Sequence, residues 1–206
     1  MTIAFISFPA AAGGNHLRNI IVSGSDFLDD YQYKKSIDDQ YKIHGPMNVH
    51  GADIGSSSLL GNINSFKLHQ ALMNPSLNSL LYGHFAELMS LRDDIRQIRD
   101  KKIIILSIDT SRCKQILSNR SAAINLQVIQ GEYYIGEQVF LYESFMYCNL
   151  FNTKQSNIMN IGIHEWFQAD ISDILNRLSF FLGAKFDYTK CQEMHSIWAK
   201  KNSDFF

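Results

Sequence analysis

A short apolar strand, a loop of small residues and an amphipathic helix follow one another between residues 3 and 21, IAFISFPAAAGGNHLRNII. Pro9 ends the expected strand because it has no N–H to donate to a sheet. No side chain in Ala10–Gly14 is larger than a methyl group, and Leu17 and Ile20 then begin a helical spacing. Because the first N–H groups of a helix lack intrahelical partners and the helix dipole favours negative charge, this arrangement predicts an anion cradle.

The loop departs from the strict phosphate-loop pattern GxxxxGK[ST], since neither a lysine nor a serine or threonine stands at its end. Two interpretations therefore stay open. In the first, the N–H groups of the loop hold a phosphate or a sulfate. In the second, the loop is a tight strand-to-helix turn whose small residues allow close packing.

Length and charge limit the classes of protein that the chain can belong to. With 206 residues, 46% hydrophobic and 19% charged, it suits a single globular domain over residues 1–206. The net charge of −1 argues against a nucleic-acid-binding protein, whose footprint is a basic excess. The three cysteines show no CxxC spacing, which favours a reducing compartment. We expect a cytoplasmic protein, because the sequence shows neither a membrane span nor a secretory signal.

Strand and helix patterns alternate along the chain and predict an α/β fold, with a mostly parallel central sheet and helices on both faces. The Ile103–Leu106 run is continuously apolar, as in a strand that is covered on both sides. Ligands of such sheets gather beyond the carboxyl ends of the strands. That rule brings together three loops: Ala10–Gly14, Gly83-His84 and Asp109–Ser111. Strands are expected near residues 3–8, 79–82, 103–106 and 158–163, and helices near 16–30, 64–74, 88–98, 111–120, 136–148, 171–182 and 189–201.

The segment from Tyr31 to Gly61 has no convincing periodicity and is predicted to be an irregular binding loop or lid. It contains His44 and His50, with Asp53 close behind. Their spacing matches no standard ligand pattern, so we expect no metal site.

Four motifs, taken in their order along the chain, resemble motifs of the sulfotransferases. The chain thus resembles a small and divergent member of this family, with a P-loop-like fold. The first resembles the family's first strand and phosphosulfate loop, and the second its strand ending in a Gly-His pair. The third is similar to the central strand and following helix, and the fourth to a late strand, an acidic-aromatic turn and a helix closing on Phe-Leu-Gly. The motifs are SFPAAAGGNHLRNII, SLLYGHFAEL, IIILSIDTSRCKQILSNR and IGIHEWFQADISDILNRLSFFLGAKFD.

The resemblance implies sulfuryl transfer from 3′-phosphoadenosine 5′-phosphosulfate to a hydroxyl or amine acceptor, a small molecule or a glycan. His84 is the expected base, because an imidazole at a strand's carboxyl end suits proton removal; a hydrogen-bonded structural histidine is the alternative. No metal, nucleic acid or membrane is expected. The residues expected at the nucleotide are Ala11, Ala12, Gly13, Gly14, Asn15 and His16 for the 5′-phosphosulfate and Arg112, Ser118 and Arg120 for the 3′-phosphate.

Two departures from the family pattern bear on catalysis. Members usually place a lysine or arginine in the first loop, where this chain has three alanines, so His16 or Arg18 is expected to substitute for that cation. The arginine that usually follows the central strand is replaced by Asp109 and Thr110, and an acidic residue repels a phosphate.

Two other functions therefore stay open. The first is a degenerate, non-catalytic member that serves as a binding or assembly subunit, for example of a phage virion, or that forms a homo-oligomer. The aromatic-rich stretch Tyr133–Phe151 would then be a docking surface. The second is a nucleotide-binding phosphotransferase of the wider phosphate-loop class, against which the missing GK[ST] counts.

Overall fold

A computed structural model describes residues 2–8, 13–27, 63, 65–73, 76–107 and 144–201 of the chain. Several sequence predictions lie outside these residues. They are the loop at residues 9–12, the lid at 31–61, the turn and helix at 109–120, and the part of the aromatic stretch before residue 144.

Four parallel strands form the sheet, in the order β2-β1-β3-β4. Their bounds are Ile3–Ser7 for β1, Ser79–Gly83 for β2, Lys101–Ser107 for β3 and Ile158–Gly162 for β4. Ser7, at the end of β1, lies beside Gly83 of β2 and Ile105 of β3. The predicted parallel α/β fold is thereby confirmed, and each strand lies within a residue or two of its expected place.

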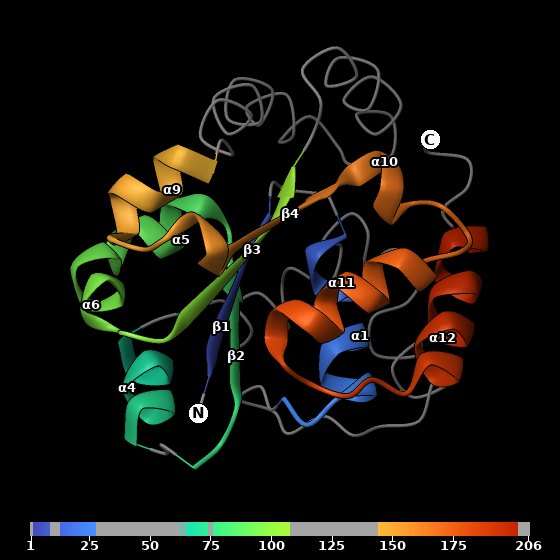
Figure 1. The fold of residues 1–206 in the computed structure, drawn as a ribbon, viewed down its shortest axis with the longest axis horizontal. Coiled ribbons are helices and arrows are strands. Elements are labelled where there is room, and N and C mark those ends of the chain that lie inside the picture. The colour runs from blue at the N-terminus through green and yellow to red at the C-terminus, as the bar shows by residue number, and fades with distance from the viewer. Residues whose placement is uncertain are drawn as a thin grey trace.

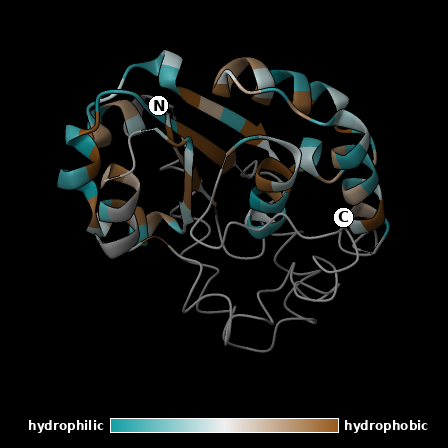
Figure 2. Cartoon of the chain, turned by 90° about the horizontal axis from the view of Figure 1, so that it is seen from below, coloured by the Kyte–Doolittle hydropathy of each residue, from teal (hydrophilic) through white to brown (hydrophobic). Residues whose placement is uncertain are grey.

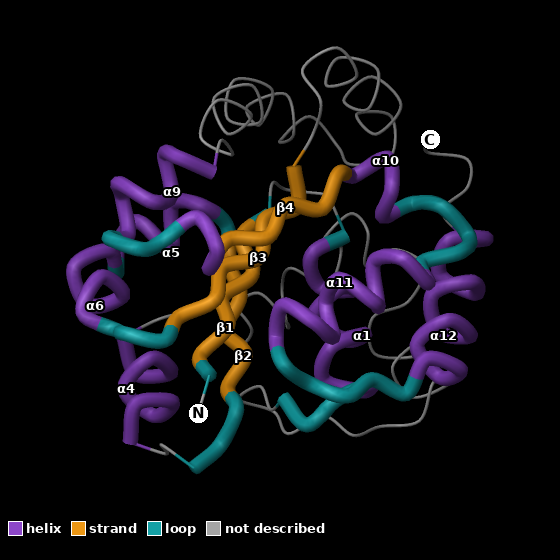
Figure 3. Tube along the Cα trace, in the orientation of Figure 1, coloured by secondary structure: helices purple, strands orange, loops and turns teal. Residues whose placement is uncertain are grey.

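Helices cover both faces of this sheet (Figures 1 and 3). On one face lie α1 (Gly14–Gly24), α11 (Ser172–Leu182) and α12 (Tyr188–Lys201). On the other lie α4 (Ser65–Met73), α5 (Phe85–Ser90), α6 (Arg92–Gln97) and α9 (Ser144–Phe151). A 3-10 helix, Gln155–Asn157, precedes β4, and the short helix α10, Ile163–Trp166, follows it.

The sheet separates two hydrophobic cores because successive side chains of a strand point to opposite faces. In β1, Ala4 and Ile6 pack with α1, α11 and α12, whereas Ile3 and Phe5 pack with α4, α5, α6 and α9. In Figure 2 the strands are largely brown, and the helices on either side of them carry more teal, hydrophilic segments. All five residues of β1 are buried, as expected for a strand covered on both sides.

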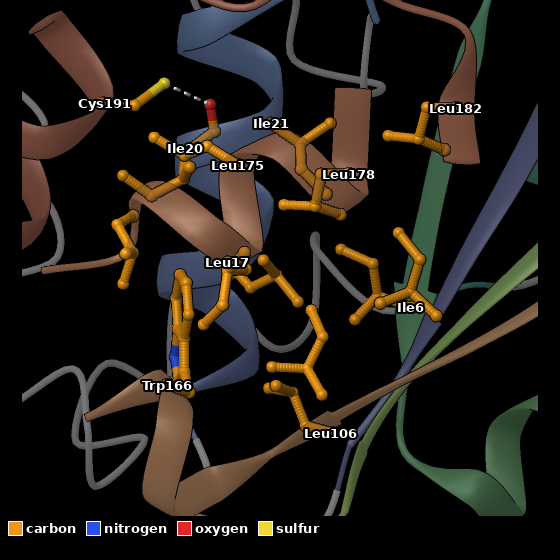
Figure 4. Close-up of a cluster of buried hydrophobic side chains, with 14 of the residues drawn as sticks. Ile6, Leu17, Ile20, Ile21, Leu106, Trp166, Leu175, Leu178, Leu182 and Cys191 are labelled. Atoms are coloured by element: carbon orange, nitrogen blue, oxygen red, sulfur yellow. Dashed lines mark hydrogen bonds between the residues drawn. The ribbon is translucent and has the colours of Figure 1, made fainter. Parts of the chain in front are cut away.

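Helix α1 is the most deeply enclosed of the described helices, with ten of its eleven residues buried. Leu17, Ile20 and Ile21 pack in the same core as Leu175 and Leu178 of α11 (Figure 4). From α12, the Cys191 Sγ lies 3.7 Å from the Ile20 carbonyl oxygen, and burial raises the pKa of this thiol to about 12. Cys191 is therefore a packing residue, because at neutral pH it holds no reactive thiolate.

Two predicted helices have different bounds in the structure. The first ends at Gly24 and not near residue 30, because the Ser25 backbone N–H and hydroxyl both bond to the Ile21 carbonyl and close the last turn. Phe27 is nevertheless buried in the core. The helix expected over residues 88–98 is divided at Leu91, whose φ of −108° and ψ of 15° interrupt the helical backbone.

The carboxyl-terminal elements agree with the sequence predictions. Helix α11 ends at Gly183, which adopts a left-handed conformation with φ of 67°. Before the helix, the Asp170 carboxylate accepts a hydrogen bond from the Ser172 N–H. Two aromatic residues of the Tyr133–Phe151 stretch, Tyr147 and Phe151, are fully buried. These two side chains therefore fill the core and are not available to a docking partner.

None of the described helices is both long and apolar enough to cross a membrane.

Lys101 is a charged residue inside this fold, only 2% exposed at the start of β3. Its ammonium donates to the carbonyl oxygens of Ile98 at 2.8 Å, Arg96 at 3.2 Å and Asn152 at 3.4 Å. Burial lowers the pKa of Lys101, and the charge of Arg96 lowers it further. Lys101 thus joins the end of α6 to the turn after α9, because one ammonium satisfies carbonyls from both segments.

We expect the substitution Lys101→Met to lower the free energy of unfolding by about 2 to 4 kcal/mol, because it leaves buried carbonyl oxygens without a donor. Urea unfolding at neutral pH measures this loss. The control is Lys102→Met, whose ammonium lies 4.9 Å from the centre of the Phe181 ring and should contribute only about 1 kcal/mol or less. Equal losses in the two variants would contradict the role given to Lys101.

Candidate functional site

The carboxyl end of β1 lies at the topological switch point of the sheet. From β1 the chain passes through α1 to β2 on one side, and it later enters β3 on the other side of β1 (Figure 1). Ligands of open α/β sheets bind at such a point, beyond the carboxyl ends of the strands. The structure therefore places Phe8, the start of α1 and the Gly83-His84 pair at the expected edge.

Helix α1 begins with backbone groups that suit an anion. Gly13 precedes it with φ of 78° and ψ of 22°, a left-handed conformation that glycine adopts without strain. No acidic residue stands in its first turn. Within the described part of the chain, no residue accepts a hydrogen bond from the Gly14 or Asn15 N–H. These donors and the helix dipole are the features that bind phosphate or sulfate groups.

Aromatic rings close the sides of these glycines. A Cβ built on Gly14 would lie 2.1 Å from the Phe8 ring. A Cβ built on Gly13 would lie 2.9 Å from Trp198 Cζ2 and 3.0 Å from Trp166 Nε1. Both positions require glycine, because these aromatic rings pack directly against the backbone of the turn.

His16 and Arg18, the two residues expected to replace the loop cation, both lie in the interior. The His16 ring is 5% exposed and stacks on Trp198, with ring centres 4.3 Å apart and planes 9° from parallel. Arg18 Nη1 donates a hydrogen bond of 2.8 Å to the Tyr82 hydroxyl, and its guanidinium lies 5.0 Å from the centre of the same ring. Arg18 is thus engaged with β2, and a catalytic part for His16 stays a prediction.

His84 follows β2 directly and is held from two sides. Its backbone N–H donates to the Glu87 carboxylate, and its Nδ1 lies 2.9 Å from the Phe8 carbonyl oxygen. Because a carbonyl oxygen only accepts, Nδ1 must carry the proton of the neutral ring. The Nε2 atom is then the basic nitrogen, on a ring that is partly exposed. A role of His84 as general base stays a prediction, with which this geometry is compatible.

Glu165, in the turn after β4, belongs to the fourth sequence motif, but the sequence predicted no role for it. The Glu165 carboxylate accepts a hydrogen bond from the Gly162 N–H and pairs with Arg177 Nη1 at 2.6 Å. This holds the short helix α10, which ends with Trp166 against Gly13. Arg177 Nη2 also donates to the Asn160 carbonyl, which ties α11 to strand β4.

His195 was not predicted from the sequence and completes an aromatic cluster of His16, Trp166, His195 and Trp198. Its ring centre lies 4.7 Å from that of Trp166 and 5.3 Å from that of His16. The Nε2 atom lies 2.8 Å from the Gln168 carbonyl oxygen and therefore carries the proton. Burial lowers the pKa of His195 to about 4, against a weaker opposing effect of this hydrogen bond. The available signal was its place on α12, beside the apolar residues Met194 and Trp198.

Five expected site residues lie outside the described part of the chain and stay predictions: Ala11, Ala12, Arg112, Ser118 and Arg120. The described residues contain no group of three or more His, Cys, Asp or Glu side chains that could hold a metal ion.

Comparison with known proteins yields a distant likeness. No protein-family model matches the chain, and no curated protein matches it. Among solved structures, the sulfotransferase domain from the Synechococcus PCC 7002 olefin synthase is similar with a TM-score of 0.47 and 15% identity. The similarity covers 91% of this chain and 74% of that domain. The α/β class rests on the strand order and the helix layers observed in this chain.

We predict opposite tautomers for the two buried or half-buried histidines of this region. Neutral His84 should carry its proton on Nδ1, because it donates to the Phe8 carbonyl, and neutral His195 on Nε2, because it donates to the Gln168 carbonyl. Long-range proton–nitrogen NMR spectra above neutral pH distinguish the two forms, with single histidine variants for assignment. An Nε2-protonated His84 would contradict the hydrogen bond that orients it.

We also predict that His195 makes the fold sensitive to acid. Above pH 6.5 the ring is neutral in both states, but between pH 6.5 and about 4 only the unfolded chain binds the proton. The free energy of unfolding should therefore fall as the pH drops through this window, by up to about 3 kcal/mol from this group. Urea unfolding at several pH values measures the loss. His195→Gln, which keeps a donor but cannot titrate, should show a shallower pH dependence, and an unchanged slope would contradict the prediction.

Proposed function

We propose that this chain binds 3′-phosphoadenosine 5′-phosphosulfate at the carboxyl edge of its sheet and transfers the sulfuryl group to a hydroxyl or amine acceptor. The observation that carries the proposal is the hydrogen bond between His84 Nδ1 and the Phe8 carbonyl oxygen. This hydrogen bond leaves Nε2 of His84 as the basic nitrogen. His84 directly follows β2, the neighbour of strand β1 that leads into α1. The serial order of the four sequence motifs supports the same assignment.

The backbone at the start of α1 fits the anionic part of the donor. The Gly14 and Asn15 N–H groups are donors in a first turn that contains no acidic residue, and the helix dipole adds a partial positive charge there. The donor supplies the sulfuryl group and leaves as 3′-phosphoadenosine 5′-phosphate. The part of this chain in the reaction is to hold the phosphosulfate, to orient the acceptor and to exclude water.

His84 removes the proton of the acceptor. As the acceptor oxygen or nitrogen forms its bond to sulfur and the bond from sulfur to the bridging oxygen of the donor breaks, the proton passes to Nε2. The Phe8 carbonyl then stabilises the doubly protonated ring, because it accepts from Nδ1. The half-exposed position of His84 allows the proton to leave to water afterwards.

A non-catalytic binding subunit is the second candidate, and two observations favour it. The first turn of α1 carries no lysine or arginine, and the Arg18 guanidinium is bonded to Tyr82. The charge that develops on the bridging oxygen thus lacks the loop cation of the related enzymes, a stabilisation of several kcal/mol. Such a subunit would keep the scaffold and use another surface.

Titration of the full chain with 3′-phosphoadenosine 5′-phosphate and with ATP, followed by calorimetry, separates the functions. Tight binding of the first nucleotide supports the sulfotransferase, and preferred binding of ATP supports a phosphotransferase. Binding of neither supports the non-catalytic subunit, whose assembly a native mass measurement would then show.

We expect His84→Gln to lower the rate of sulfuryl transfer by about 10²- to 10⁴-fold while the affinity for 3′-phosphoadenosine 5′-phosphate stays within about twofold, as for the loss of a general base. Transfer of labelled sulfur from the donor to a panel of hydroxyl and amine acceptors measures the rate. The control is His69→Gln, an exposed histidine on α4, which should keep the full rate. An active His84 variant would exclude His84 as the base.

A further inference from the structure

Trp166 carries a buried polar atom that makes no hydrogen bond within the described part of the chain. Its side chain is 0% exposed, and the buried Nε1 has no hydrogen-bond partner. A buried indole N–H usually finds a partner, in the protein or in a bound molecule. The unsatisfied donor is therefore free to bond to an acceptor on a bound molecule.

The position of this nitrogen shows where the acceptor would lie. Nε1 is 3.0 Å from the place where a Cβ of Gly13 would be, and Gly13 is the residue that opens α1. Figure 4 shows Trp166 alongside the end of α1 that carries Leu17. The indole donor and the first backbone N–H groups of the helix are thus neighbours at one helix terminus.

The imidazole of His195, which packs against Trp166, carries no positive charge at neutral pH. The ring centre of His195 is 4.7 Å from that of Trp166, and its Nδ1 is also buried without a partner. Burial keeps this imidazole neutral at pH 7. Trp198 covers the same glycine with its ring carbons Cζ2 and Cη2.

We propose that Trp166 Nε1–H and the first backbone N–H groups of α1 form one binding site for a tetrahedral oxyanion. The inference rests on the proposed function, because the phosphosulfate of the nucleotide is the expected occupant, and free sulfate or phosphate shares its chemistry. Trp166 supplies a neutral side-chain donor at the end of the sheet where related enzymes place a cation. It is a binding residue for the anion and takes no proton.

The two tryptophans of the chain make the test direct, because Trp166 and Trp198 are the only residues with an indole N–H. A proton–nitrogen correlation spectrum therefore contains two indole signals, and either Trp166→Phe or Trp198→Phe assigns both. The full chain is titrated separately with sodium sulfate, sodium phosphate and 3′-phosphoadenosine 5′-phosphate, and affinities are measured by calorimetry.

The Trp166 proton should move downfield to saturation as it enters a hydrogen bond to the anion, with a smaller shift for Trp198. Trp166→Phe should weaken anion affinity about tenfold, the effect of one hydrogen bond to a charged group. The matched control, Trp198→Phe, also replaces an indole packed on Gly13 but should weaken it less. If sulfate or phosphate shifts the Trp166 signal but 3′-phosphoadenosine 5′-phosphate does not, the anion site is supported and the proposed nucleotide binding is contradicted.

Two results would show that the inference about Trp166 is wrong while the proposed function stands. In the first, the wild-type chain binds the nucleotide but the Trp166 signal does not move. In the second, Trp166→Phe binds the nucleotide with unchanged affinity. If the wild-type chain binds none of the three probes, both are wrong. The NMR titration of the wild-type chain decides even if Trp166→Phe fails to fold, because Trp198→Phe assigns the signals.

Discussion

The packing of Phe8 at the end of β1 is the contact on which the candidate site depends. Its ring fills the space beside Gly14 and meets the rings of Tyr82 and His84, with centres 6.4 and 4.9 Å away. Its carbonyl fixes the tautomer of His84. One residue therefore sets the start of α1 and the base after β2 relative to each other. The ring leaves no room for a Cβ on Gly14, so any larger residue there would displace Phe8.

Some polar side chains of the interior form hydrogen bonds that join separate elements of the fold. The Ser7 hydroxyl and the Tyr147 hydroxyl lie 2.9 Å apart and join the end of β1 to α9 across the second core. Lys101 joins α6 to the turn after α9 in the same way. Buried polar groups that are satisfied by specific partners favour one arrangement of the elements, since any slip would leave them unpaired. Thr153 Oγ1, Trp166 Nε1 and His195 Nδ1 depart from this rule, and the last two lie in the cluster beside Gly13.

Much of the fold was predictable because local signals and global packing agree. The apolar run at Ile103–Leu106 could be covered on two sides only in a central strand, and Gly183 follows an amphipathic stripe that needs a left-handed cap. The predicted end of the first helix was several residues too late. Phe27 continues the helical spacing in the sequence, but in the structure it lies beyond the end of α1 and is still buried in the core. The break at Leu91 was missed, since its apolar side chain fits the stripe of either a continuous or a divided helix.

The sequence by itself determined the alternation of strands and helices, the small residues before α1 and the place of His84 after β2, because each is encoded by neighbours along the chain. Only the tertiary structure decided what those residues meet. Gly13 is covered by Trp166 and Trp198, more than 150 residues away in the chain, and Arg18 is directed to Tyr82. Such contacts depend on how the two cores pack against the sheet, which periodicity does not specify. The indole N–H beside α1 therefore became visible only when the chain was folded.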